Sequence, residues 1–179
     1  AYDRAAALYW ADRFDEAARA YAEVRDSPID DRHFTRAARR VVESETRRLE
    51  AAIADGTSPT APTEDAPTPT AVPEAVQRVA RAREMYVRWV RPHEDVEHVR
   101  DAYAFNNALL VQRYGFASAA RARLGAIFRA RCTGPLASEV GRDAFVAMVH
   151  AATELRNLDE LDRLTRELRQ RRCTFAPDG

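Results

Sequence analysis

Lysine is absent from this sequence: all 28 basic residues are arginine, and 28 acidic residues balance them to a formal net charge of zero. A chain without excess positive charge lacks the bulk attraction to phosphate backbones on which general nucleic-acid binding depends. Glycine is scarce as well, with six residues, and no Gly-rich phosphate-binding loop occurs. Nucleic-acid and nucleotide binding are therefore not favoured.

Long hydrophobic runs are also missing. No apolar stretch approaches the roughly 20 residues that a membrane-spanning helix needs, so we expect no membrane span in this segment. The chain begins at Ala1, without methionine and inside a helical pattern. A signal peptide or lipid anchor upstream of this segment is compatible with that start.

The residues that are abundant favour helices. The chain is 46% hydrophobic, much of this alanine, and its apolar residues recur at three- and four-residue spacing rather than in alternation. The pattern predicts an all-α fold of about eight helices with no strand. We expect Asp30 or Asp31 to cap the third helix and Gly56 to end it. The predicted helices cover 1–11, 14–26, 32–54, 74–91, 95–114, 116–131, 137–155 and 158–171.

The segment TSPTAPTEDAPTPTAVP, residues 57–73, holds five of the nine prolines and almost no large apolar side chain. Such a composition does not form a packed helix or strand. A solvated loop or spacer is the usual interpretation, and a proline-rich ligand for a partner protein is the alternative. We treat residues 57–73, the Pro/Thr-rich segment, as an insertion.

One pattern recurs along the chain. In the first copy, ADRFDEAARAY places the aromatic Phe14, the small Ala17 and the large Tyr21 in order after a turn. In the second, FNNALLVQRYGFASAARARLGAIFRARC places Ala120 and Leu124 after the turn at Gly115. These stretches resemble the tetratricopeptide repeat, in which a small residue lets paired helices approach and a ring four residues later fills the gap. Ala108 lies where close packing is needed.

A third copy, AMVHAATELRNLDELDRLTRELRQRRC, departs from the repeat, because Leu161 stands where alanine is usual and Leu158 takes the aromatic place. The resemblance implies antiparallel helix pairs stacked as a right-handed solenoid. The predicted organisation has four parts. Residues 1–56 form a repeat-like pair and the first helix of a divergent pair, and residues 57–73 are the insertion. Residues 74–173 form the second helix of the divergent pair and two further repeat-like pairs, and residues 174–179 are a tail.

A narrower resemblance involves RVARAREMYVRWVRPHEDVEH followed by NNALLVQRYGFASAARARLGAIF. These stretches are similar to periplasmic tetratricopeptide-type proteins of myxobacteria and their relatives, including proteins of gliding motility. The resemblance implies a bacterial scaffold in a cell-envelope or motility complex. Its expected location is the periplasm or cell envelope, with the cytoplasm as the alternative.

The two cysteines, Cys132 and Cys173, occupy equivalent places just past the second helix of copies two and three. A disulfide between them would close a loop of about 40 residues and contribute about 3–4 kcal/mol in the loop-entropy account. It would also imply an oxidising compartment. Two free thiols are the alternative, because neighbouring helices lie farther apart than a disulfide reaches unless the loops lean together.

The stretch HEDVEH, residues 93–98, has two histidines and nearby glutamates, as the metal-binding motif of zinc proteases does. Such enzymes need two histidines four residues apart on one helical face, and here His93 and His98 are five apart. We interpret the stretch as the polar first turn of a helix, where carboxylates interact well with the helix dipole. His33 and His150 are isolated. We expect no metal, no cofactor and no enzymatic activity.

Arginines cluster in RAARR (36–40), ETRRL (45–49) and RELRQRR (166–172), each interleaved with or close to acidic residues. A salt-bridged helix face is the favoured interpretation, and a regulatory or nucleic-acid-binding domain is the alternative function. Two pairs of aromatic residues can be interpreted either as anchors of a protein interface or as part of the core. They are Tyr9 with Trp10, and Tyr86 with Trp89.

The favoured function is a noncatalytic protein–protein interaction scaffold. In the tetratricopeptide arrangement the first helix of each pair lines a concave groove, where extended peptides or partner helices dock. The Asn106 amide would bond the backbone of a bound peptide and Arg113 would supply charge, although both are also suited to a solvent-facing role. The predicted groove residues are Tyr2, Trp10, Asn106, Arg113, His150 and Glu154.

Overall fold

The computed structural model describes residues 1–27, 32–132 and 138–171. These residues form eight helices and no strand, which confirms the predicted all-α class. No helix within the described ranges is long and apolar enough to cross a membrane. The helices are α1 (Tyr2–Trp10), α2 (Phe14–Arg25), α3 (Phe34–Ala54), α4 (Glu74–Trp89), α5 (Arg100–Arg113), α6 (Ala117–Arg131), α7 (Glu139–Glu154) and α8 (Leu158–Arg171).

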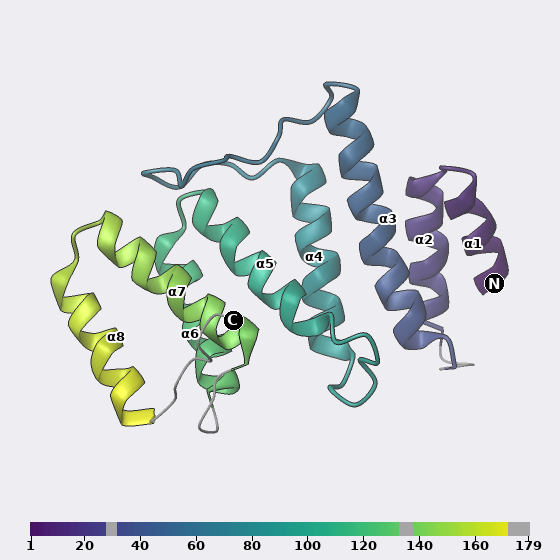
Figure 1. The fold of residues 1–179 in the computed structure, drawn as a ribbon. Coiled ribbons are helices and arrows are strands. Elements are labelled where there is room, and N and C mark those ends of the chain that lie inside the picture. The colour runs from purple at the N-terminus through teal and green to yellow at the C-terminus, as the bar shows by residue number, and fades with distance from the viewer. Residues whose placement is uncertain (28–31, 133–137, 172–179) are drawn as a thin grey trace.

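The helices stand side by side in chain order, from α1 at one end to α8 at the other (Figure 1). Each helix packs against the next, and α5 also contacts α7, its neighbour but one. This packing agrees with a helical repeat, in which each unit contacts its neighbours along the row. The handedness of the stack stays a prediction.

The start of α5 differs from the prediction. The helix was expected from residue 95 but begins at Arg100, and His98 before it has a left-handed φ of 54°. The buried Asp95 carboxylate instead accepts hydrogen bonds from the backbone N–H groups of Val99 (3.3 Å) and Arg100 (2.9 Å). These N–H groups at a helix start lack intrahelical partners, so Asp95 acts as a cap from outside the helix.

The other boundaries follow the prediction within about two residues. Gly56, with a φ of 69°, ends α3 as expected, because this left-handed conformation suits glycine just after a helix. The helix itself begins at Phe34 with His33 at its N-cap position. The predicted caps Asp30 and Asp31 lie outside the described residues.

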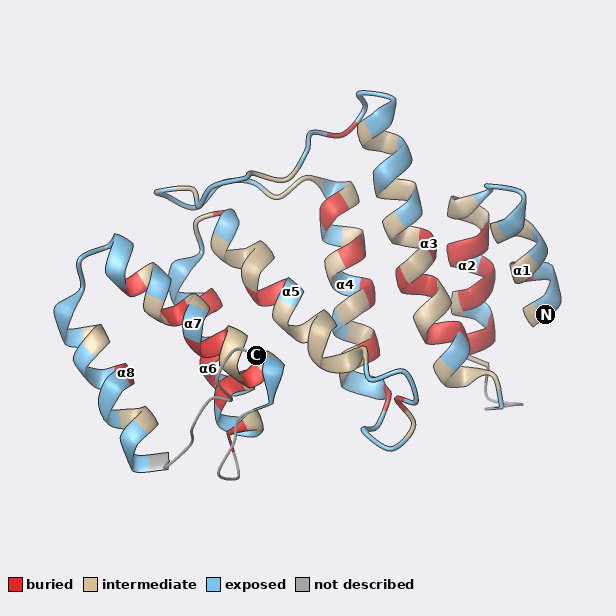
Figure 2. Ribbon diagram, in the orientation of Figure 1, coloured by how far each residue is buried: buried red, intermediate tan, exposed pale blue. Residues whose placement is uncertain are grey.

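The core is divided into two clusters, and Figure 2 shows buried residues in both halves of the row of helices. The N-terminal cluster joins α1 to α4 around Tyr21 and Tyr86, and its other fully buried members are alanines and valines. The C-terminal cluster joins α5 to α8 around Leu124, Phe128 and Leu164. Each large apolar side chain buried in this way contributes about 1.5–3 kcal/mol.

The repeat positions are buried to different degrees. Ala17 and Tyr21 in the first copy, and Ala120 and Leu124 in the second, are each at most 1% exposed. In the third copy Leu158 is 75% exposed, and Leu161, at the position usually taken by alanine, is only half-buried. A leucine at a close-approach position keeps a neighbouring helix further away, which agrees with the looser seating of α8.

Candidate functional site

A groove of about 750 Å³ lies between α5 and α7, the first helices of the second and third repeat-like pairs. Its volume is within the range of about 300–1,000 Å³ that is usual for binding clefts. We call it the α5–α7 groove. Helix α5 contributes Phe105, Leu109, Gln112 and Arg113, α7 contributes Asp143, Val146, Ala147, His150 and Glu154, and the Pro/Thr-rich segment contributes Thr63, Glu64 and Asp65.

The floor of the α5–α7 groove is apolar and open to solvent. Val146 is 55% exposed, and Phe105, Leu109 and Ala147 are half-buried. Exposed apolar surface bordered by polar groups is typical of sites that contact other proteins. The floor therefore provides contact area that the described residues leave uncovered.

The rim of the groove is acidic. Four carboxylates, those of Glu64, Asp65, Asp143 and Glu154, line the groove together with one guanidinium, that of Arg113, and Asp143 also pairs with Arg142 (3.3 Å), which is not among the lining residues. The Nε2 atom of His150 lies 3.6 Å from the Glu154 carboxylate. Acids and arginines are equal in number in the chain as a whole, so the excess of carboxylates is a local property of this groove.

The Pro/Thr-rich segment forms one edge of the groove. In Figure 1 it runs from the end of α3 across α4 to α5 and back to the start of α4. Its backbone donates two hydrogen bonds to the end of α5, from Ala66 to the Arg113 carbonyl (3.0 Å) and from Thr70 to the Tyr114 carbonyl (2.9 Å). The last carbonyls of a helix lack intrahelical partners, so the segment completes the end of α5.

A side-chain contact adds to this attachment, because Gln112 Nε2 donates to Asp65 Oδ2 at 2.5 Å. The segment contains no helix or strand, as expected. The spacer interpretation is nonetheless incomplete, since these contacts hold residues 65–70 against the end of α5. Contacts made by an irregular segment have no periodic signal in the sequence from which they could be predicted.

Gly115 allows the close approach of this segment. The residue has a left-handed φ of 81°, as its predicted turn requires, and a Cβ atom built on it would lie 2.2 Å from the Thr68 carbonyl oxygen. Such a distance is far shorter than any van der Waals contact. Glycine is therefore required here twice, for the turn and for the passage of residues 68–69.

The predicted groove residues fall into two groups. Arg113, His150 and Glu154 meet in the α5–α7 groove. Trp10, 75% exposed, lies at the other end of the row, in a hollow of about 590 Å³ shared by α1 and α3. Tyr2 is half-buried, stacked on His33 at 4.8 Å between ring centroids.

Asn106 is exposed on α5 but does not line the groove. The neighbouring Asn107 is buried instead, and its Nδ2 donates to the Ala80 carbonyl of α4 at 2.8 Å. The acceptor belongs to the chain itself, so Asn107 has a packing role, and the predicted role of Asn106 toward a bound peptide stays a prediction. The spacing of Tyr103, Asn107 and Tyr114 places Asn107 on the buried stripe of α5, which is the signal that could have identified it.

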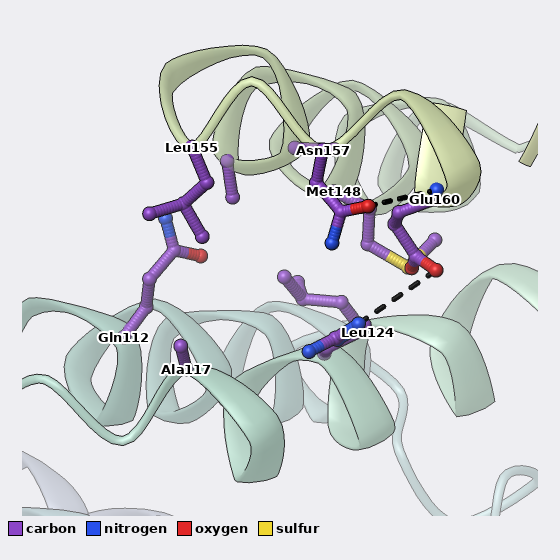
Figure 3. Close-up of a pocket in the computed structure, with 10 residues that line it drawn as sticks. Gln112, Ala117, Leu124, Met148, Leu155, Asn157 and Glu160 are labelled. Atoms are coloured by element: carbon purple, nitrogen blue, oxygen red, sulfur yellow. Dashed lines mark hydrogen bonds and ion pairs between the residues drawn. The ribbon is translucent and has the colours of Figure 1, made fainter. Parts of the chain in front are cut away.

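A smaller cavity lies beneath the turn between α7 and α8 (Figure 3). Gln112 and Leu155 face each other at one end, and Asn157 and Glu160 close the other, where the Glu160 N–H donates to Asn157 Oδ1 at 3.1 Å. The cavity measures about 40 Å³. This space admits water molecules but is far below the size of an organic ligand site.

Cys132 is buried at the end of α6, 3% exposed, and is disulfide-bonded. Its predicted partner Cys173 lies outside the described residues. Burial at the edge of the C-terminal cluster agrees with a structural role for the Cys132 sulfur.

The HEDVEH stretch is a turn rather than part of α5. Its buried acid, Asp95, accepts a hydrogen bond from the Tyr86 hydroxyl at 2.8 Å, and burial together with this carboxylate raises the pKa of Tyr86 well above its usual range. His93 and His98 are exposed. Within the described ranges no group of three or more His, Cys, Asp and Glu residues is arranged to hold a metal ion.

Carboxylates bind many of the clustered arginines. Arg39 pairs with Glu43 and Glu97, Arg47 with Glu50, and Arg48 with Asp15 and Glu45. On α8, Arg166 pairs with Asp162 at 2.9 Å. Guanidinium groups held in this way are less available for phosphate, which favours the interpretation as salt-bridged helix faces.

Comparison of the chain with protein-family models, curated proteins and solved structures finds no match to any of them. The tetratricopeptide resemblance therefore depends on the motifs in the sequence and on the packing of adjacent helices.

Proposed function

We propose that this chain is a noncatalytic interaction scaffold, and that the α5–α7 groove binds a segment of a partner protein. The observation that carries the proposal is the exposed apolar floor bordered by charged residues, built from the first helices of two neighbouring pairs. Tight contact along such a floor gains free energy from apolar burial, while the rim fixes the orientation of the bound segment.

The proposed cellular setting is a bacterial cell-envelope or motility assembly. The disulfide-bonded state of Cys132 supports an oxidising compartment such as the periplasm, because disulfides persist mainly there. The arginine clusters give no matching support to nucleic-acid binding, since acidic neighbours engage many of their guanidinium groups.

Selection from a library of displayed random peptides tests the groove directly. Peptides enriched on the wild-type protein are expected to bind Val146→Gln about tenfold more weakly, because burial of one valine side chain contributes at least about 1.5 kcal/mol. Val96→Gln is the matched control, since Val96 is also an exposed valine, 81% exposed, and lies outside the groove.

Enriched peptides that bind the Val146→Gln variant as tightly as the wild type would place the binding surface elsewhere. Failure to enrich any peptide would remove the evidence for a peptide-binding scaffold. Binding affinities of the individual peptides, measured by fluorescence anisotropy, give the comparison.

A further inference from the structure

We infer that the α5–α7 groove is selective for a cationic, apolar protein segment, and that the Pro/Thr-rich segment is a specificity element supplying half of the recognising carboxylates. The inference rests on the proposed function of the groove. Its evidence is the combination of an open apolar floor with four carboxylates against one guanidinium.

Two other hollows among the described residues do not share this imbalance. The hollow shared by α1 and α3 carries Arg40 and Arg47 with Asp12 and Glu50, an equal number of each sign. The hollow beside the start of α3 is lined by four arginines and three glutamates. A positively charged partner is therefore expected to bind at the α5–α7 groove rather than at these two hollows, because complementary charge steers association and selects among partners.

The carboxylates come from two sources with different roles. Asp143 and Glu154 project from α7, near its two ends, and mark the length of the groove. Glu64 and Asp65 come from the Pro/Thr-rich segment, which is held in place by its hydrogen bonds to the end of α5. Proline limits the conformations of this segment, so its two acids are presented to the groove with little loss of entropy on binding.

The occupant that fits this surface alternates apolar and basic side chains. Apolar residues would cover Val146 and the half-buried Phe105 and Leu109, while arginine or lysine side chains would reach the acids on both edges. Arginine forms bidentate bonds with carboxylates, which adds geometric selectivity to charge.

Three synthetic peptides of equal length test the inference by fluorescence anisotropy at physiological ionic strength: alternating Leu and Arg, alternating Leu and Glu, and alternating Gly and Arg. The Leu–Arg peptide is expected to bind most tightly, and the other two at least about tenfold more weakly. The Glu64→Gln/Asp65→Asn double variant is expected to weaken Leu–Arg binding about five- to tenfold.

The matched control is Asp3→Asn/Glu23→Gln, which removes the same charge from exposed positions on α1 and α2. Equal weakening by the control variant, or equal binding of the Gly–Arg peptide, would reduce the interaction to general charge attraction and overturn the inference.

The two proposals fail in different ways. Equal binding of the Leu–Arg and Leu–Glu peptides, with both lost in Val146→Gln, would overturn the charge selectivity and leave the groove as a peptide site. If the Val146→Gln variant binds all of the peptides as tightly as the wild type does, the groove is not the binding site. The far-ultraviolet circular dichroism of each variant confirms that it retains its helices.

Discussion

The two halves of this chain bury different side chains and expose different surfaces. The N-terminal cluster is made of alanine, valine and two tyrosines, and the hollow beside it holds balanced charges, with Arg40 lying 5.3 Å over the Tyr9 ring. The C-terminal cluster contains Phe128 and Phe145, and the α5–α7 groove beside it has an excess of carboxylates. The hollow of the N-terminal half carries equal numbers of carboxylates and guanidinium groups, whereas the α5–α7 groove, which we propose as a binding site, has more carboxylates than guanidinium groups and an exposed apolar floor.

The largest expected effect comes from emptying the C-terminal core. Phe128→Ala is expected to lower the free energy of unfolding by about 3–5 kcal/mol, because the fully buried ring leaves a cavity against Phe145. Since the two clusters are separate, amide hydrogen exchange should accelerate more in α6 to α8 than in α1 to α3.

Tyr21→Ala is the matched change in the N-terminal cluster, where the ring is equally buried. It should accelerate exchange mainly in α1 to α3. If either variant loosens all eight helices equally, the chain has one cooperative core and the division into two clusters is wrong.

The alanine-rich packing of the N-terminal half can be tested by enlarging one side chain. Ala17→Leu is expected to destabilise the protein by about 1–3 kcal/mol, because Ala17 is fully buried where helices approach closely. Ala7→Leu, on the exposed side of α1, is the control. Urea denaturation with equal midpoints for the two variants would contradict the close-approach role of Ala17.

The attachment of the Pro/Thr-rich segment depends on Gly115. Gly115→Ala is expected to cost about 1–3 kcal/mol and to make residues 57–73 more susceptible to proteolysis, because both the left-handed φ and the contact with Thr68 oppose a side chain. Gly56→Ala is a matched control, since Gly56 also has a left-handed φ but meets no atom within 4 Å. Equal proteolysis of the two variants would contradict the attachment.

The smallest expected effect is a difference in how the stability contributions of two glutamates, Glu160 and Glu45, depend on pH. Hydrogen bonding to Arg163 lowers the pKa of Glu160 in α8, so its stabilisation is present at neutral pH and is lost as the pH falls through the lowered value. Burial raises the pKa of Glu45 in α3, so stability from that group is greatest at low pH and is lost as the pH rises through the raised value.

Glu160→Gln is therefore expected to lower stability at about pH 7 by about 0.5–1 kcal/mol, with the difference shrinking toward about pH 3. Glu45→Gln should show no loss at neutral pH. Thermal denaturation across this range measures both variants, and a neutral-pH loss for Glu45→Gln that matches Glu160→Gln would contradict the assigned directions.

Much of the fold could be predicted because it is periodic. Apolar spacing located the eight helices, and Gly56 marked the end of α3. The start of α5 was misplaced, since the stretch HEDVEH at 93–98 suits a first helical turn as well as a turn outside the helix. The hydrogen bonds of Asp95 decide between the two, and they depend on the tertiary position of Tyr86.

The groove was predictable only in part. Helical register alone could place Arg113, His150 and Glu154 on first helices, and these residues do meet. The contribution of Glu64 and Asp65 could not be foreseen, because it depends on how an irregular segment returns to α5. Asn106 and Asn107 show that one residue on a helix, a rotation of about 100°, separates an exposed amide from a buried one.

Hydrogen–deuterium exchange with and without the Leu–Arg peptide tests the central claim most directly, because it reports every helix at once. The account predicts slower exchange in α5, in α7 and at residues 63–66 of the Pro/Thr-rich segment, with α1 to α3 unchanged. Protection confined to α1 to α3, or no protection in the presence of saturating peptide, would contradict the assignment of the α5–α7 groove as the binding surface.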